Sequence, residues 1–218
     1  MCGRNFHWHH RRMNRNYQKE LDRLLSSMEG KPQKLFLHSC CAPCSSYVLE
    51  YLSQYFEITI FYYNPNISPE EEYRNRVEEQ NRLIGQLDTI YPISFMEGKY
   101  EPEKFYQMAR GMEELPEGGQ RCYACYEMRL REAAQKAVVQ KADYFTTTLS
   151  ISPYKNARWI NEIGEKLERE YGVRHLPSDF KKKNGYRRSI ELSRQYHLYR
   201  QDYCGCIYSK MERERQKD

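Results

Sequence analysis

Short runs of apolar and β-branched residues alternate along the chain with longer stretches in which apolar residues recur every three or four positions. The short runs have the pattern of buried strands and cover residues 34–39, 57–64, 89–95, 143–150 and 173–176. The longer stretches predict helices over residues 45–55, from 68 onward, 101–112, 122–140 and 153–171. This alternation predicts an α/β fold in which helices cover both faces of a parallel sheet.

Two helix ends carry recognisable signals. Ser68 is placed to cap a helix whose first turn holds Pro69 and the acidic residues Glu70 and Glu71. At the other end, Gly172 is expected to close the helix over residues 153–171. In a parallel sheet, ligands bind beyond the carboxyl ends of the strands. Reactive residues that directly follow a predicted strand are therefore candidates for a functional site.

The first 30 residues differ from the rest because they are polar and basic. They end in a stretch with apolar residues at helical spacing, namely Tyr17, Leu21, Leu24, Leu25 and Met28. We expect residues 1–30 to form a basic arm and a docked helix. Residues 31–218 are expected to form a single α/β catalytic domain that carries the metal site, with a C-terminal helical or loop segment.

Composition narrows the class of protein. The 218 residues contain no uncharged apolar run of about 18 residues, and no apolar core follows the basic start, so neither a membrane span nor a signal peptide is expected. The chain is therefore expected in the cytoplasm, where thiol pools keep disulfides reduced. Its eight cysteines then favour metal binding or redox chemistry.

Three of these cysteines, Cys40, Cys41 and Cys44, follow the first predicted strand and open the next helix. A helix N-terminus stabilises thiolates through its dipole and its free backbone N–H groups, and thiolates are good metal ligands. The alternative is that they are small core residues, which a strand interior would suit better than this loop.

A second pair, Cys122 and Cys125, stands at the start of a strongly helical stretch. The spacing puts both sulfurs on one face of the first turn, which suits zinc or one edge of an iron–sulfur cluster. A dithiol redox pair is also compatible with this spacing. Together with the first three cysteines, this pair makes a shared four-thiolate site plausible, with one thiol left over.

Cys204 and Cys206 flank Gly205 near the C-terminus. Two thiols one residue apart can close only a tight and easily reduced disulfide ring, which suits a reversible redox pair. A second metal edge or two unpaired thiols are the alternatives. Cys2 lies in the basic arm and has no assigned role.

Two other polar residues follow predicted strands. Asp179 could act as an acid or a hard metal ligand, although Ser178 and Asp179 could equally cap the next helix. His38 ends the first strand and could be a donor into the site or a hydrogen-bonded core histidine. No Gly-x-Gly-x-x-Gly motif or Walker-type lysine loop is present, which argues against those modes of nucleotide binding.

Several of these motifs together resemble the QueH-type epoxyqueuosine reductases. The segments that carry the resemblance are HSCCAPCSS (38–46), YNPNISPEEEY (63–73), RCYACYEMRL (121–130), FTTTLSISPYKN (145–156) and FKKKNGYRRSIELSRQYHLYRQDYCGC (180–206). The similarity covers nearly all residues from Lys34 to Tyr208. Distinct motifs in one order are far more specific than any single cysteine pair.

The resemblance implies the last step of queuosine biosynthesis, reduction of epoxyqueuosine to queuosine in tRNA, on a fold similar to the adenine-nucleotide α-hydrolases. It implies a 4Fe-4S cluster bound by Cys40, Cys41, Cys122 and Cys125. It further implies a redox-active disulfide between Cys204 and Cys206, with Asp179 as a candidate acid. An additional iron is implied near Cys44, because some members carry Asp at that position.

The chemistry of the residues agrees with this role. Removing an epoxide oxygen takes two electrons, which a cysteine pair can store, while an iron with an open position can act as a Lewis acid. The formal charge of +5 and the basic, aromatic segment over residues 180–200 suit the anticodon loop of tRNA. An electron donor of unknown identity is also needed. A zinc-stabilised RNA-binding protein and a metal-free dithiol oxidoreductase are the alternatives.

Overall fold

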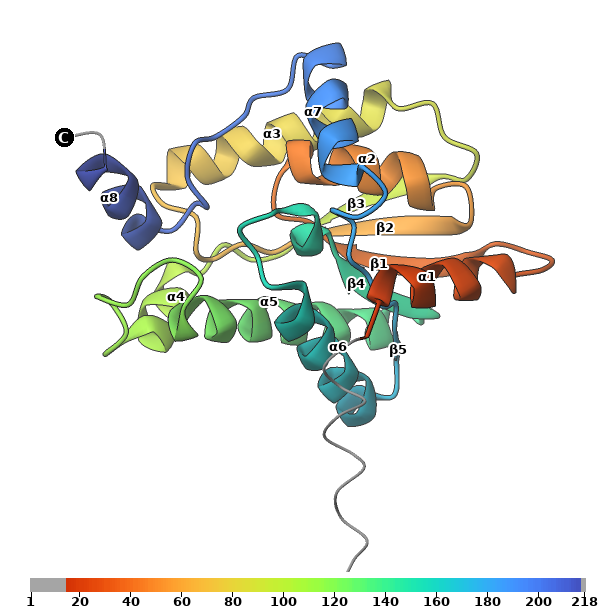
Figure 1. Ribbon diagram of the computed structural model, residues 1–218, viewed down its shortest axis with the longest axis horizontal. Coiled ribbons are helices and arrows are strands. Elements are labelled where there is room, and N and C mark those ends of the chain that lie inside the picture. The colour runs from red at the N-terminus through yellow and green to blue at the C-terminus, as the bar shows by residue number, and fades with distance from the viewer. Residues whose placement is uncertain (1–14, 217–218) are drawn as a thin grey trace, which may run out of the picture.

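The computed structural model describes residues 15–216, and a single five-stranded sheet lies at its centre (Figure 1). Its strands are β1 Gln33–His38, β2 Phe56–Tyr62, β3 Ile93–Glu97, β4 Tyr144–Thr147 and β5 Arg174–His175. All neighbours pair in parallel, in the order β3-β2-β1-β4-β5. Because the order reverses direction at β1, a crevice opens beyond the carboxyl ends of β1 and β4.

Helices cover both faces of the sheet, which confirms the predicted α/β class (Figure 1). They are α1 Tyr17–Ser26, α2 Ala42–Leu52, α3 Glu70–Gln86, α4 Pro102–Ala109, α5 Gln120–Val139, α6 Ala157–Tyr171, α7 Gly185–Gln195 and α8 Ile207–Arg215. A short 3₁₀ turn, η1 Thr148–Ile151, follows β4. No helix within residues 15–216 is long and apolar enough to cross a membrane.

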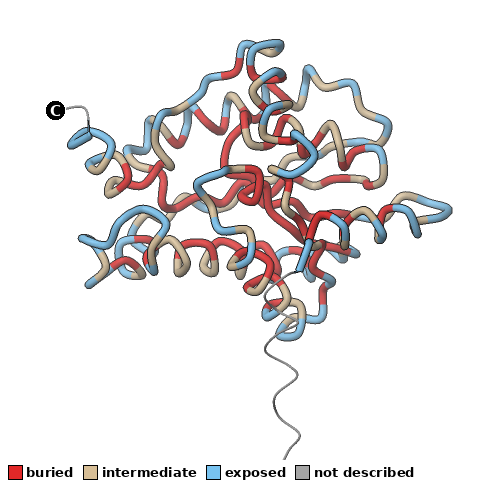
Figure 2. The backbone as a smooth tube through the Cα atoms, viewed as in Figure 1, coloured by how far each residue is buried: buried red, intermediate tan, exposed pale blue. Residues whose placement is uncertain are grey.

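Strand alternation divides the core between the two faces, since successive side chains of a strand point to opposite sides. Leu35 and Leu37 pack with residues of α1, α2 and α3, whereas Phe36 packs with residues of α5 and α6. Figure 2 shows the buried segments gathered along the strands and the inner sides of the helices. Leu21 and Leu25 place α1 in the first of these two cores.

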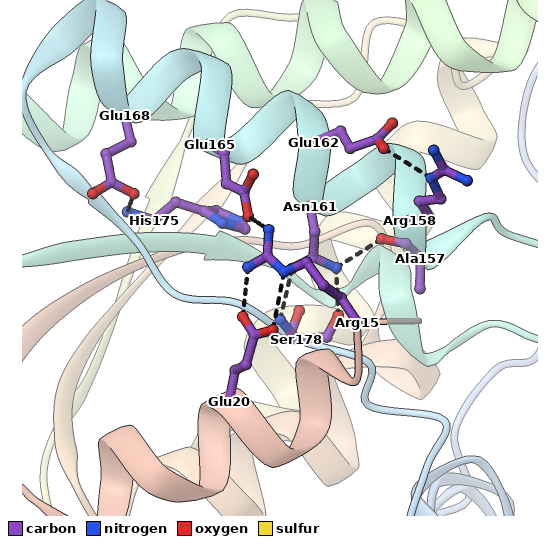
Figure 3. Close-up of polar contacts among 10 residues, drawn as sticks. All are labelled: Arg15, Glu20, Ala157, Arg158, Asn161, Glu162, Glu165, Glu168, His175 and Ser178. Atoms are coloured by element: carbon purple, nitrogen blue, oxygen red, sulfur yellow. Dashed lines mark hydrogen bonds and ion pairs between the residues drawn. The ribbon is translucent and has the colours of Figure 1, made fainter. Parts of the chain in front are cut away.

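An arginine before α1 adds polar contacts between α1 and α6 to this packing (Figure 3). Arg15 donates to Glu20 of α1 at 3.0 Å and also contacts Glu165 of α6. On α6, Asn161 holds the loop after β5 by accepting from the Ser178 backbone N–H at 2.9 Å and donating to its carbonyl at 2.8 Å. This pair fixes where the chain leaves the sheet.

Most predicted elements are confirmed, and the differences have local causes. β3 begins at Ile93, after Pro92, because proline has no N–H to donate to a neighbouring strand. Gly172 closes α6 in the left-handed region with φ +75°, as expected. The expected Ser68 cap is wrong, because Pro69 is the N-cap of α3 and the Ser68 N–H donates instead to the Gly205 carbonyl at 2.9 Å.

Candidate metal centre

The first group of thiols lies where β1 runs into α2. Cys41 is the N-cap of α2, and the sulfurs of Cys40, Cys41 and Cys44 all lie within 4.8 Å of one another. The Cys40 and Cys41 sulfurs are 3.9 Å apart. Among the described residues, this is the one group of three or more metal-ligating side chains at such distances. These thiols could bind a metal ion.

The loop that carries these cysteines is held by its neighbours. The Cys40 N–H donates to the Thr148 hydroxyl at 3.3 Å, and the same hydroxyl lies 3.5 Å from the Cys40 sulfur. On the other side, the Asn64 amide donates to the Ser39 carbonyl at 2.8 Å. The cysteines are therefore fixed by η1 and by the loop after β2, and not only by their own helix.

Proton sharing within the group singles out Cys40. Hydrogen bonds from the Cys41 and Cys44 thiols lower the pKa of Cys40 well below its usual value, although burial opposes this. The same contact with Cys40 raises the pKa of Cys41 to about 11 and that of Cys44 well above its usual range. The hydrogen bonds among the three thiols thus stabilise a thiolate in this group, and a bound metal would have to displace the remaining protons.

The second group of thiols lies at the start of α5. Cys122 and Cys125, one turn apart, line a small cavity together with Cys204 and Cys206 from the C-terminal segment. Burial raises the pKa of Cys122 to about 11 and that of Cys125 to about 12. All seven cysteines within residues 15–216 are free thiols.

The Cys204–Gly205–Cys206 loop is anchored against the loop before α3. The Arg76 guanidinium donates to the Cys204 carbonyl at 3.3 Å, and the Gly205 carbonyl accepts from Ser68. Gly205 has φ +125°, and a Cβ there would lie 3.0 Å from Ile67 and 3.1 Å from Arg76. Only glycine fits this position without a shift of the loop.

The two groups of thiols border one crevice. A cavity of about 480 Å³ is lined by Cys40, Cys41 and Cys44, and also by Cys204. Cys204 and Arg129 line both this cavity and the small one at α5. The structure thus brings together three segments that are far apart in the sequence, but it keeps Cys122 and Cys125 outside the close group of three.

Buried or half-buried cations complete the crevice, and sequence reasoning missed them. Arg76, Arg129 and Lys155 all line the larger cavity. Arg76 is 2% exposed and pairs with Glu72 at 2.7 Å, while its Nη2 atom has no hydrogen-bond partner. Such an orphaned buried donor suits an anionic or oxygen-rich occupant. The one available signal was the place of Arg129 four residues after Cys125, on the same helix face.

His38 lies in the core below the cysteines as a hydrogen-bonded histidine. It is fully buried, its Nδ1 lies 2.7 Å from the Thr147 hydroxyl, and burial lowers its pKa to about 3. Its Nε2 lies 3.3 Å from the Arg129 Nε. Of the two interpretations, the core histidine is the one that the contacts support.

Asp179 lies apart from the thiols. Its carboxylate accepts from the Lys181 ammonium at 2.6 Å, and it is absent from the residues that line the two cavities. Helix capping by this pair is not seen, since Ser178 bonds Asn161 and Ser150 and α7 begins at Gly185.

The family model described as "Epoxyqueuosine reductase QueH" matches residues 35–212. A protein of that name from Staphylococcus epidermidis is 46% identical over 203 residues, which cover 90% of this chain and 85% of the relative. One from Streptococcus pyogenes is 43% identical over 205 residues, with coverage of 90% and 80%. One from Thermotoga maritima is 34% identical over 185 residues, with coverage of 82% and 91%. The range matched by the family model includes both groups of cysteines.

Proposed function

The chain belongs to the epoxyqueuosine reductase QueH family, and on this premise we propose how its residues reduce epoxyqueuosine to queuosine in tRNA. The observation that carries the proposal is that seven thiols from three distant segments line two cavities that share Cys204 and Arg129. Sulfur donors of this number suit iron–sulfur clusters and zinc rather than magnesium or calcium.

We propose that Cys40, Cys41, Cys122 and Cys125 hold a 4Fe-4S cluster between the two groups of thiols. A cluster is larger than a single ion, so its ligands need not come as close as those of one metal ion. Once bound, it would supply electrons one at a time to the site. Cys44, which contacts both Cys40 and Cys41, is the ligand available to an additional iron.

We propose that Cys204 and Cys206 supply the two electrons that reduction of the epoxide needs. When both thiols become a disulfide, they release two electrons and two protons. An epoxide that accepts both loses its oxygen as water and leaves a carbon–carbon double bond. The position of Cys204 on both cavities supports this role, because it lies beside the proposed cluster ligands and beside the space for substrate. An external electron donor must then reduce the disulfide again.

Asp179 is a candidate acid on the same edge of the sheet, and its ion pair with Lys181 must open before it can serve. Lys155 is the alternative acid, because its side chain lines the larger cavity. The variants Asp179→Asn and Lys155→Met separate the two by their single-turnover rates.

We propose that the anticodon loop of tRNA enters the larger cavity past its tyrosines. Tyr154 is 72% exposed at the cavity rim, where a neighbouring base could stack on it. The expected stacking by Phe180 is not possible, because this side chain is fully buried in the core. Lys183 and Arg188 also pair with carboxylates, at 2.7 Å in each case, so fewer cations of that segment are free for phosphates than the sequence suggests.

We further propose that residues 31–218 act as one catalytic domain preceded by the arm and helix of residues 1–30, and that the protein works in the cytoplasm. The basic residues Arg4, Arg11 and Arg12 and the cysteine at position 2 lie outside the described residues.

The test is anaerobic purification followed by iron, sulfide and zinc analysis. The proposal expects a brown protein with about four irons and four sulfides per chain, lost in Cys122→Ala. A colourless zinc protein that binds RNA without reducing epoxyqueuosine would support the zinc-stabilised alternative.

A further inference from the structure

Arg129 is a buried cation that lacks a carboxylate partner. It is 1% exposed, and its side-chain hydrogen bonds within residues 15–216 go to no carboxylate. Its contacts are the Asn64 side-chain oxygen at 2.5 Å, the His38 Nε2 at 3.3 Å and the Cys125 sulfur at 3.9 Å. The first two are neutral, so the Cys125 thiol is the one of these contacts that can become an anion.

The other two large buried arginines show how the fold normally balances such a charge. Arg76 pairs with Glu72 at 2.7 Å. Arg121 donates to the backbone carbonyls of Met112 and Glu113, at 2.9 and 2.8 Å, and holds the loop before α5. An unbalanced buried charge is strongly destabilising, so the environment of Arg129 points to an anion that belongs beside it.

The position of Arg129 identifies that anion by its chemistry. It lines both cavities, as Cys204 does, while Cys40 lines the larger cavity and Cys125 the smaller one. A guanidinium stays charged at every accessible pH, so it cannot relieve its burial by losing a proton. Its Nε lies 3.3 Å from the His38 Nε2, which in turn lies 3.1 Å from the Tyr63 carbonyl oxygen.

We infer that Arg129 is a positioning residue, the fixed internal counter-cation of the thiolate centre that both groups of cysteines share. The inference rests on the proposed function and deepens it. Four thiolates leave an oxidised 4Fe-4S cluster with an overall charge of about −2, and reduction adds one more negative charge. A buried cation in contact with one ligand therefore stabilises the bound cluster and raises its reduction potential.

The test is a potentiometric titration of the anaerobic holoprotein with Arg129→Met, Arg129→Lys and the wild type. The equilibrium constant for reduction should fall at least tenfold in Arg129→Met, a shift of about 59 mV toward more negative potential for one electron. Arg129→Lys, which keeps the charge, should recover most of it. Arg131→Met is the matched control, because Arg131 lies on the same helix but is half-exposed and paired with Glu127.

The inference would be overturned if the equilibrium constant for reduction in Arg129→Met differed less than twofold from that of the wild type at equal cluster content. If circular dichroism shows that Arg129→Met is unfolded, Arg129→Gln replaces it, because glutamine keeps a donor toward Asn64. Loss of the cluster from the neutral variants but not from Arg129→Lys supports the inference, whereas equal loss from all three folded variants overturns it.

Failure of the cofactor assignment would be visible separately. If the wild-type protein holds zinc and no cluster, the proposed cofactor is wrong, and the role of Arg129 is read from Zn²⁺ affinity by chelator competition. At least tenfold weaker Zn²⁺ binding in Arg129→Met than in Arg129→Lys supports the counter-cation. Equal affinity in both overturns it.

Discussion

Replacing Gly205 by alanine perturbs the cysteine loop at a single atom. The backbone there has φ +125°, far from the left-handed value near +57° that other residues tolerate. The added Cβ would also meet Ile67 at 3.0 Å and Arg76 at 3.1 Å. Backbone strain of this kind costs about 1–3 kcal/mol, and displacing the neighbours adds to it.

The loop can escape this strain by moving, because its anchors include two single hydrogen bonds, from the Ser68 N–H to the Gly205 carbonyl and from the Arg76 side chain to the Cys204 carbonyl. We therefore expect local displacement rather than global unfolding. At about 1.4 kcal/mol for each factor of ten, a positioning cost of about 2 kcal/mol lowers the single-turnover rate about 30-fold.

The assay is single-turnover reduction of epoxyqueuosine in an RNA stem-loop, followed by mass spectrometry, with urea denaturation measured in parallel. Gly111→Ala is the matched control, since Gly111 also has positive φ, +79°, but nothing lies within 4 Å of its would-be Cβ. It should lose less stability, because its φ lies nearer the tolerated left-handed value and its Cβ meets no neighbour, and it should keep its rate. Full activity in Gly205→Ala would refute the argument that this loop must hold both cysteines in place.

Three further predictions follow from other features. Burial raises the pKa of Cys122 to about 11 and that of Cys125 to about 12, above the unfolded value of about 8.5. The protonated thiols therefore stabilise the metal-free fold at neutral pH, and this contribution is lost as the pH rises above about 8.5. The urea midpoint of the metal-free protein should fall between pH 8 and 10, and an unchanged midpoint would contradict the burial of these thiols. Tyr154→Ala should weaken binding of an anticodon stem-loop by about 1–3 kcal/mol in a fluorescence anisotropy titration while Tyr154→Phe should not, and equal loss in both variants would exclude stacking. Gly164→Ala should destabilise the protein by about 1–3 kcal/mol in a denaturant titration, because its Cβ would lie 2.3 Å from the His175 ring, and His175→Ala should relieve most of that loss when the two are combined.

The sequence was sufficient for the layers of the fold, because strand and helix periodicities are local properties. It could also place Cys40 and Cys41 beyond a strand end, since parallel strands bring their carboxyl ends to one edge. It could not foresee that Ser68 would leave its expected helix cap to bond Gly205, because that contact joins segments more than 130 residues apart.

The cations of the crevice were hidden for a related reason. Arg76 and Arg129 stand on amphipathic helices where arginine ordinarily faces solvent, and their burial depends on tertiary packing. Phe180 is the opposite case, an aromatic residue in a basic segment that suggested a base-stacking surface but packs in the core. Local patterns identify reactive residue types well and their exposure poorly.

The central claim is that this crevice reduces epoxyqueuosine with thiolate-bound metal and the Cys204–Cys206 pair. The most direct measurement is mass spectrometry of the nucleosides from epoxyqueuosine-containing tRNA after incubation with the anaerobically reduced protein. Queuosine should form with the wild type, and epoxyqueuosine should persist with Cys125→Ser and with Cys204→Ser. Equal conversion by metal-free protein, or by both variants, would contradict the account.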